Sequence, residues 1–519
     1  MVAALRAEWT KFRTVRGWVI GMIAAAVLID LAGLFAAGNS NTSCGAGRAG
    51  AACLPPVPTG PGGEAVTDSF YFVRQPLGPH GRITVRVTSL TGRESAGNGR
   101  ARPGQGPGAS LRPGLQPWSK AGIMIAASTR PGAPYAAMLV TGGHGVRMQV
   151  DYTQDIAGRP GPVSAASPRW LRLARSGATL TGYDSADGSH WAQVGRVRLA
   201  GLPTWADGGL FAASPGVSTV TPFFGGSSSR GGPSLDTAVF DHVRLAGGGA
   251  GGRWAGGVIG GASSAGPRFN ALQGYRQAGG MFTVTGSGDI APALAGGAGD
   301  TGFPTATIED HLLGTFAGLI AVVVIGAMFM TTEYRRGLIR ATLAATPRRG
   351  QVLAAKAVVI GSVSFVAALA ASAVAVAAGV QESRSQGEYV LPVSGLTELR
   401  VIVGSAALLA VAAVLALSIG AVLRRSAAAV TAVIVGVVLT YILGTASVLP
   451  AGAAGWLLRV TPAAGFAIQQ SIPRYAQVSA QYAPPVYFPL PPWAGFAVLC
   501  GYAAVALTAA YLLLRRRDA

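Results

Sequence analysis

Hydrophobic residues along the chain gather into six runs, each long enough to cross a membrane as a helix. A helix rises about 1.5 Å per residue, so about 20 apolar residues span a hydrocarbon core of about 30 Å. The first run ends the segment 1–37, after a short amphipathic stretch. The other five lie in residues 306–519, at 308–330, 352–379, 399–423, 427–449 and 493–514. The pattern predicts a membrane protein with six transmembrane helices.

The first run also fits a second interpretation, a secretory signal peptide. Basic residues precede it, and Ala36-Ala37 resembles a small-residue cleavage site. The run is longer than a usual signal core, however, and Asp30 interrupts it. We therefore expect an uncleaved transmembrane helix, with Asp30 reaching toward the outer interface because a carboxylate in lipid is costly.

Residues 38–305 contain no run of membrane length and alternate between apolar and polar positions, as half-buried strands do. Short strands divided by turns are typical of an all-β sandwich. The expected strands lie at 83–87, 137–150 with a turn at His144-Gly145, 170–175, 179–194 with a turn at Asp187-Gly188, 237–245 and 281–285. Gly/Pro-rich stretches at 93–117, 225–233 and 247–266 are predicted loops. The fold class is thus a six-helix membrane protein with an all-β jelly-roll or sandwich domain inserted between the first and second helices.

The distribution of charge predicts the orientation. Only 12% of the residues are charged, whereas soluble proteins average about 25%. Fifteen lysines and arginines flank the runs on the side of the termini, and the short connections on the other side hold four: Arg384, Arg400, Arg459 and Arg474. Because basic flanks remain in the cytoplasm, both termini are expected there and the β-domain outside the cell, on a multi-pass protein of the plasma membrane. Most clustered charges flank the runs, so no nucleic-acid partner is expected.

Two cysteines, Cys44 and Cys53, follow the first run closely. Outside the cell a disulfide between them is favoured, with two free thiols as the alternative. No cysteine and histidine cluster has the spacing of a zinc site, and no metal is expected. In the β-domain, Asp184 and Asp187 resemble the carboxylate pair of a glycoside hydrolase. Their place around a turn favours turn formation instead, and no catalytic residue is assigned.

A short basic segment, residues 331–351, separates the second run from the third. Met328–Lys356 reads MFMTTEYRRGLIRATLAATPRRGQVLAAK, and this pattern resembles the first cytoplasmic loop of ABC-2-type transporter permeases. The resemblance extends over the six runs and the N-terminal segment but not over the insert. It implies a short coupling helix that begins near Glu333, ends at Pro347 and contacts a separate ATPase subunit. The residues assigned to this coupling loop are Glu333, Tyr334, Arg335, Arg336, Gly337, Arg340, Pro347, Arg348 and Arg349.

The same resemblance implies the permease subunit of an ABC exporter that pairs with a second permease chain, as a homo- or heterodimer, within membrane lipid. Only three lysines occur, Lys11, Lys120 and Lys356, and none is followed by Ser or Thr, so the chain has no P-loop of the usual form. The chain is therefore expected to be no enzyme and to carry no cofactor, with ATP bound by the partner ATPase.

Four motifs of the insert resemble the concanavalin-A-like, lectin- or glucanase-type jelly rolls. They are W-S-K-A-G-I-M-I (118–125), P-R-W-L-R-L (168–173), Y-D-S-A-D-G-S-H-W (183–191) and T-G-S-G-D-I (285–290). This resemblance keeps a second function open, a membrane-anchored extracellular protein that binds or senses glycans. Its tryptophans would stack on sugars, although such residues more often form the core and rim of a sandwich. Six helices with a basic segment between the second and third exceed what an anchor needs, so the transporter is preferred.

Overall fold

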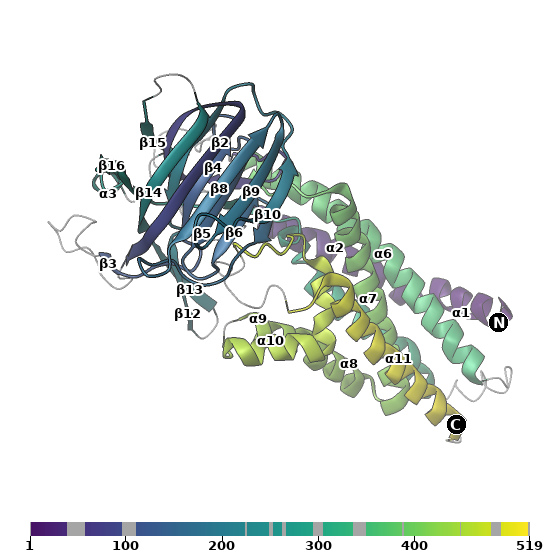
Figure 1. Cartoon of the computed structure of the whole chain (residues 1–519). Helices are drawn as coiled ribbons and strands as arrows, with labels where there is room; N and C mark the ends of the chain where they lie inside the picture. Colours follow the sequence, from purple (N-terminus) through teal and green to yellow (C-terminus); the bar gives the residue numbers. More distant parts are fainter. Residues whose placement is uncertain are drawn as a thin grey trace.

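The computed structural model describes residues 2–38, 58–95, 111–223, 226–248, 253–261, 266–293, 305–335, 349–386, 389–446, 448–478 and 489–516. These residues form a bundle of long helices with a β-domain at one end (Figure 1). Both chain termini lie at the other end of the bundle. The structure confirms the predicted fold class of six membrane-length helices with a β-domain between the first and second.

Six helical segments of the described chain are long and apolar enough to cross a membrane. They are α2 (Arg16–Gly38), α4 (Thr315–Arg335), α6 (Arg349–Ser385), α7 (Gly395–Leu423), the run α8 (Ser426–Ile434), η3 (Val435–Leu439) and α9 (Thr440–Thr445), and α11 (Pro492–Arg516). The third is the longest, at 37 residues, and extends past both ends of its hydrophobic run at 352–379.

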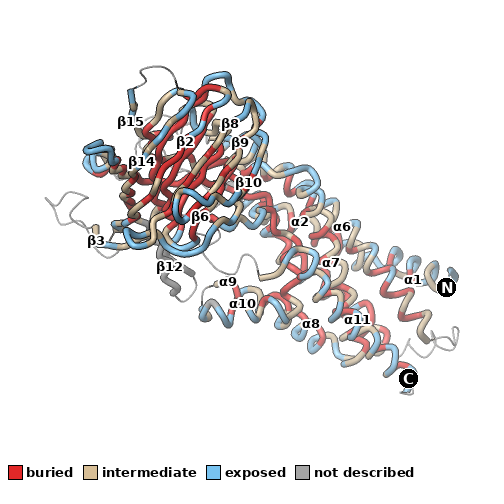
Figure 2. Tube along the Cα trace, in the orientation of Figure 1, coloured by how far each residue is buried: buried red, intermediate tan, exposed pale blue. Residues whose placement is uncertain are grey.

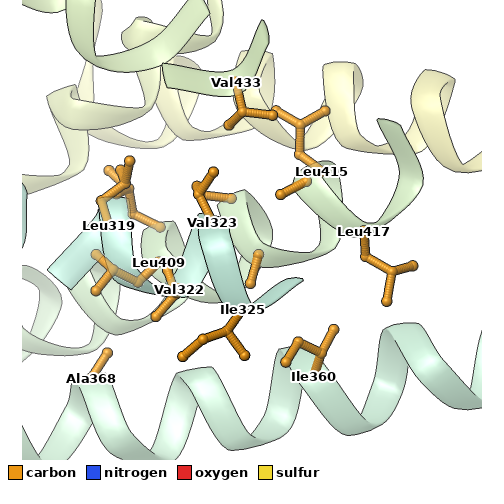
Figure 3. Close-up of a cluster of buried hydrophobic side chains, with 14 of the residues drawn as sticks. Leu319, Val322, Val323, Ile325, Ile360, Ala368, Leu409, Leu415, Leu417 and Val433 are labelled. Atoms are coloured by element: carbon orange, nitrogen blue, oxygen red, sulfur yellow. The ribbon is translucent and has the colours of Figure 1, made fainter. Parts of the chain in front are cut away.

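Helix α7 forms the centre of the bundle, where it packs against α4, α6 and α11. Its sequence is apolar on all sides, as expected for a helix surrounded by protein. Figure 3 shows Leu319 and Val323 of α4 near Leu409 of α7 in the buried core. A Cβ atom on Gly326 of α4 would lie 2.4 Å from the carbonyl oxygen of Ala413. The small residue therefore lets the two backbones approach closely, as in other membrane helix pairs.

Short elements complete the membrane part. An N-terminal helix, α1 (Val2–Thr14), packs against α6, and a 3-10 turn, η2 (Asp310–Leu312), precedes α4. Between the fifth and sixth spans lie α10 (Ala451–Val460) and the 3-10 helix η4 (Pro462–Gln469). Pro462 begins η4, where its missing N–H costs no helix hydrogen bond.

The strands of the β-domain pair antiparallel. They are β1 (Val66–Asp68), β2 (Phe70–Ser95), β3 (Leu111–Pro113), β4 (Lys120–Ala126), β5 (Tyr135–Thr141), β6 (Val146–Val150), β7 (Gln154–Ala157), β8 (Arg169–Ser176), β9 (Thr179–Ser185), β10 (Ala192–Arg198), β11 (Ala206–Ala213), β12 (Val217–Phe223), β13 (Gly226–Gly232), β14 (Ser234–Gly248), β15 (Ala255–Ile259), β16 (Gly274–Ala278), β17 (Met281–Gly286) and β18 (Ile290–Pro292). A short helix, α3 (Pro267–Asn270), precedes β16.

The long strand β2 belongs to two layers. Its first part, residues 70–77, pairs with β11 and β15, and its second part, residues 82–94, pairs with β8 and β14. We call the layer β10-β9-β8-β2-β14-β17-β16 the distal sheet and the layer β7-β6-β5-β4-β11-β2-β15 the proximal sheet. Buried residues such as Ile83 and Leu171 of the distal sheet meet Ile123 and Met138 of the proximal sheet. The predicted sandwich is thereby confirmed, and Figure 2 shows its buried strands.

The other face of the proximal sheet is turned toward the helix bundle. It carries a second apolar cluster that includes Met124 and Tyr152 and is covered by Ile290 of β18. Beyond this layer, Ala291 packs with Val478, which lies between η4 and α11. The buried side chain of Gln477 donates a 2.7 Å hydrogen bond to the carbonyl oxygen of Tyr152. A two-residue parallel pair, β19 (Thr305–Ala306) with β20 (Tyr389–Val390), lies at the same end of the bundle.

Two predicted hairpins are confirmed, β5–β6 around His144-Gly145 and β9–β10 around Asp187-Gly188. Gly188 adopts φ of 80°, which suits glycine at this turn. The loop predictions were wrong in part, because β13 lies in 225–233, β15 in 247–266, and β3 with the end of β2 in 93–117. These segments pair through backbone groups, which need no alternating side chains.

Candidate functional site

The structure describes the two ends of the predicted coupling loop. Glu333, Tyr334 and the backbone of Arg335 end α4, and Arg349 begins α6. The other assigned residues lie outside the described part of the chain: Arg336, Gly337, Arg340, Pro347 and Arg348. The two cysteines Cys44 and Cys53 lie outside it as well, so their disulfide stays a prediction.

The prediction that Glu333 lies near the start of a helix is wrong, because Glu333 lies in the last turn of α4. The helix continues past its apolar run, and two hydroxyl groups there are hydrogen-bonded to its own backbone. Thr331 donates to the carbonyl oxygen of Ala327 at 2.9 Å, and Thr332 donates to that of Met328 at 2.8 Å. The side chain of Glu333 is 5% exposed, so it faces the protein interior.

Four charged side chains from three helices meet at this end of the bundle. We call them the basal charge cluster: Glu8, Lys11, Glu333 and Lys356. The ammonium nitrogen of Lys356, on a fully buried side chain, lies 2.8 Å from Oε2 of Glu8 and 2.6 Å from Oε1 of Glu333. Lys11 donates to the same oxygen of Glu333 and lies 3.6 Å from Oε1 of Glu8.

Three helices position the basal charge cluster. Glu8 and Lys11 lie one turn apart on α1, and the buried Phe12 follows them toward the bundle. Lys356 lies two turns into α6, and its ammonium nitrogen is 4.7 Å from the ring centroid of Phe329 on α4. That ring also meets Phe12 edge to face, with centroids 6.1 Å apart. Aromatic and ionic contacts thus fix the same three helices together.

The cluster pairs two carboxylates with two ammonium groups. A buried charge is tolerated only when it is paired and hydrogen-bonded, and removing one partner of a buried pair typically costs about 3–5 kcal/mol. Partial burial by itself lowers the pKa of Lys11, but its hydrogen bond to Glu333 and the charges of Glu333 and Glu8 raise the pKa above its ordinary value overall. Lys11 therefore remains an ammonium group at neutral pH.

Further contacts join the same ends of α4 and α6 to the remaining helices. The guanidinium of Arg424, in the turn between α7 and α8, lies 5.1 Å from the ring centroid of Tyr334. Arg349 donates a 2.7 Å hydrogen bond to the carbonyl oxygen of Leu514 in α11. Both ends of the predicted coupling loop are therefore connected to the bundle as a whole.

Sequence reasoning missed Glu8 and Lys356 as members of the site. A signal was present, because two of the three lysines belong to the cluster and Glu8 is the single acid among the basic residues of the N-terminal segment. A lysine inside an apolar run and a lone acid among basic residues indicate pairing, since an unpaired buried charge is costly.

A cavity of about 520 Å³ opens at the β-domain end of the bundle, between η2, α4, α9, α10 and η4. Phe316, Tyr441 and Phe466 form an aromatic wall, with ring centroids 4.3–5.2 Å apart. Glu309 and Asp310 supply carboxylates to the lining. The combination of apolar walls with a few polar groups is typical of small-molecule sites.

The β-domain residues that resembled a glycoside hydrolase or sugar-binding site make structural contacts instead. Asp184 is buried and accepts a hydrogen bond from the backbone N–H of Arg159 at 2.9 Å. Asp187 accepts from the backbone N–H groups of Ser189 and His190, as predicted for a turn-forming residue. The tryptophans are dispersed, with Trp118 buried, Trp170 and Trp191 half-buried and Trp205 exposed.

Comparison with known families gives one match: residues 262–519 match the family described as ABC-2 family transporter protein. A comparison with curated proteins finds no match. Among solved structures, a functionally unknown protein from Saccharomyces cerevisiae shares 15% identity over 37% of this chain and 83% of that one, with a TM-score of 0.23. Scytalido-glutamic peptidase shares 7% identity over 44% of this chain and all of that one, with a TM-score of 0.27. Neither structure shows the fold of this chain at so low a TM-score, so the concanavalin-A-like resemblance stays a prediction.

Proposed function

Residues 262–519, which comprise the last strands of the β-domain and the second to sixth spans, belong to the ABC-2 family of transporter proteins. From this premise we propose that the protein is the permease subunit of an exporter driven by a separate ATPase. The partner binds and hydrolyses ATP, and the permease moves the substrate. A second permease chain completes the transporter in the plasma membrane. Both termini then face the cytoplasm and the β-domain lies outside the cell.

The basal charge cluster is the observation that carries this proposal. A partner that pushes on residues 336–348 must move α4, α6 or both, since the segment joins them. Glu333 of α4 and Lys356 of α6 are linked to each other and to Glu8 of α1. A displacement at the segment therefore reaches three helices at once. Because α7 packs against both α4 and α6, it reaches the centre of the bundle as well.

Co-expression with the ABC ATPases of the source genome tests the proposal. The ATPase is expected to co-purify with the wild-type chain. The double variant Arg336→Glu with Arg340→Glu reverses two charges in the coupling loop and is expected to abolish co-purification. The matched control, Arg384→Glu with Arg474→Glu, reverses two exposed charges at the other end of the bundle and should retain the partner. Failure of the wild type to bind, or equal binding by both variants, would contradict the proposal.

A further inference from the structure

The distal sheet presents a basic face to solvent. On β2, the exposed Arg82 precedes the buried Ile83, and on β8, Arg172 lies between the buried residues Leu171 and Leu173. Because successive side chains of a strand point to opposite faces, the arginines lie on the face away from the sandwich core. The proximal sheet separates this face from the helix bundle, so the face also points away from the membrane.

The arginines of this face lie in rows across neighbouring strands. We call the following residues the basic face: Arg82, Arg172, Arg196, Arg198 and Arg244, with Trp170, Tyr183 and Trp191. In one row, Arg244 and Arg172 lie on either side of Thr84, and in the next, Arg82 and Arg196 flank two small residues. Strands lie about 5 Å apart and two residues along a strand span about 7 Å, so the charges form an extended array.

The positive charge of this array is not neutralised within the described residues. Arg86, at the edge of the face, forms a bidentate pair with Asp241 at 2.6–2.7 Å. The four exposed arginines of the basic face have no ion pair there: Arg82, Arg196, Arg198 and Arg244. Burial and then the charge of Arg82 lower the pKa of Arg172, which agrees with a short separation between the two guanidinium groups.

Aromatic rings hold part of this charge in place. The guanidinium of Arg172 lies 3.7 Å from the ring centroid of Trp191, which is a cation–π contact. A guanidinium has a planar set of donors that fits a carboxylate with two hydrogen bonds. Trp170 and Tyr183 are half-buried beside it in the same face.

We propose that the basic face binds an anionic polysaccharide whose carboxylate groups pair with the rows of arginines. An extended array suits a polymer better than a single small anion. Arginine, tryptophan and tyrosine also occur at protein–protein interfaces, but the centre of such an interface is apolar, whereas arginines occupy the centre of this face. The inference rests on the proposed extracellular location of the β-domain. Its test needs no ATPase, so failure here leaves the transport proposal intact.

The test measures binding of the full-length protein, in neutral-lipid nanodiscs, to polygalacturonate at low and high salt. The wild type is expected to bind, and to bind more weakly as salt rises, because exposed charge pairs are screened. Arg82→Gln with Arg196→Gln should weaken binding about tenfold, since each exposed charge pair contributes only modestly to binding. The control, Arg130→Gln with Arg253→Gln, removes two exposed charges outside the distal sheet and should change binding less than twofold. Arg172→Lys keeps the charge but loses the planar donors, and should also weaken binding.

Three results would overturn the proposal. The first is no binding of polygalacturonate by the wild type. The second is equal binding by the distal-sheet variant and the control. The third is preference for a neutral glucan, or for anionic vesicles containing phosphatidylglycerol, over the acidic polymer, which would assign the face to neutral sugars or to a lipid surface.

Discussion

The ammonium nitrogen of Lys356 lies 2.6 Å from Oε1 of Glu333, although the two residues are 23 positions apart and belong to different helices. The pair connects the end of α4 with the first turns of α6. It therefore links the two helix ends that border the predicted coupling loop. Glu8 and Lys11 attach α1 to the same helix ends.

Breaking this pair is expected to destabilise the membrane part. Lys356→Met removes the ammonium group and leaves Glu333 and Glu8 buried with Lys11 alone, at a cost of about 3–5 kcal/mol. Adding Glu333→Gln removes one of the orphaned carboxylates, so the double variant should be less destabilised than the sum of the single variants. Thermal unfolding in detergent compares the wild type, the two single variants and the double variant. The exposed Arg384→Met serves as the control. Additive effects would show that the two residues do not interact.

The raised pKa of Lys11 predicts a loss of stability at high pH. A lysine whose pKa is higher in the folded state contributes stability that is present below its ordinary pKa of 10.5 and is lost as pH rises through the folded value. The unfolding temperature of the wild type should therefore exceed that of Lys11→Met at pH 8, and the difference should shrink toward pH 11. A constant difference across this range would contradict the assigned charge interaction.

Asp236 predicts a loss of stability with rising pH in the β-domain too, but over a lower pH range. Its side chain is fully buried in β14, and burial raises its pKa well above the ordinary value. The folded state therefore holds a proton that the unfolded chain releases above about pH 4, and stability falls as pH rises from there. Asp236→Asn removes this dependence and should raise the unfolding temperature at pH 7 more than at pH 4. The exposed Asp187→Asn offers a comparison at a residue whose pKa is lowered instead.

Gln477 is expected to hold the β-domain on the bundle. Gln477→Leu removes its hydrogen bond to the carbonyl oxygen of Tyr152 and leaves that buried acceptor unpaired, at about 1–3 kcal/mol. Hydrogen exchange followed by mass spectrometry should become faster in peptides that cover β1 and β18, which lie at this contact. The exposed Gln193→Leu on β10 serves as the control. Unchanged exchange at β1 and β18 would show that the hydrogen bond does not hold the two parts together.

The orientation of the chain in the membrane can be tested by labelling single cysteines on intact cells. A cysteine at Ser227 of β13 should react with an impermeant reagent on intact cells, whereas one at Thr346 should react only after the membrane is opened. The expectation follows from the excess of basic residues on the side of the termini. Labelling of position 346 but not of 227 on intact cells would reverse the topology.

The parts of the fold that depend on periodicity were predictable from the sequence. The six apolar runs and the alternation at Ile83–Val87 both reflect burial, which leaves a local pattern. By contrast, β13 reads GSSSRGG and pairs through its backbone, so no pattern of side chains indicates it. The scarcity of lysine indicated that these charges are paired, but the partners in the basal charge cluster were not predictable, because Glu8 and Lys356 are 348 positions apart and only the tertiary packing of α1 brings them together.

We propose that nucleotide binding by the partner moves the bundle through the basal charge cluster. The most direct test uses the cavity at the β-domain end of the bundle, between η2, α4, α9, α10 and η4. A cysteine at Thr445, in the cavity lining, is introduced into a chain without its natural cysteines, and its labelling rate is measured with and without ATP and vanadate. Trapping the nucleotide is expected to change the rate several-fold in this background. No change is expected once Glu333→Gln and Lys356→Met are added, although the ATPase still co-purifies. An equal change with and without the cluster, or none in either, would contradict the account.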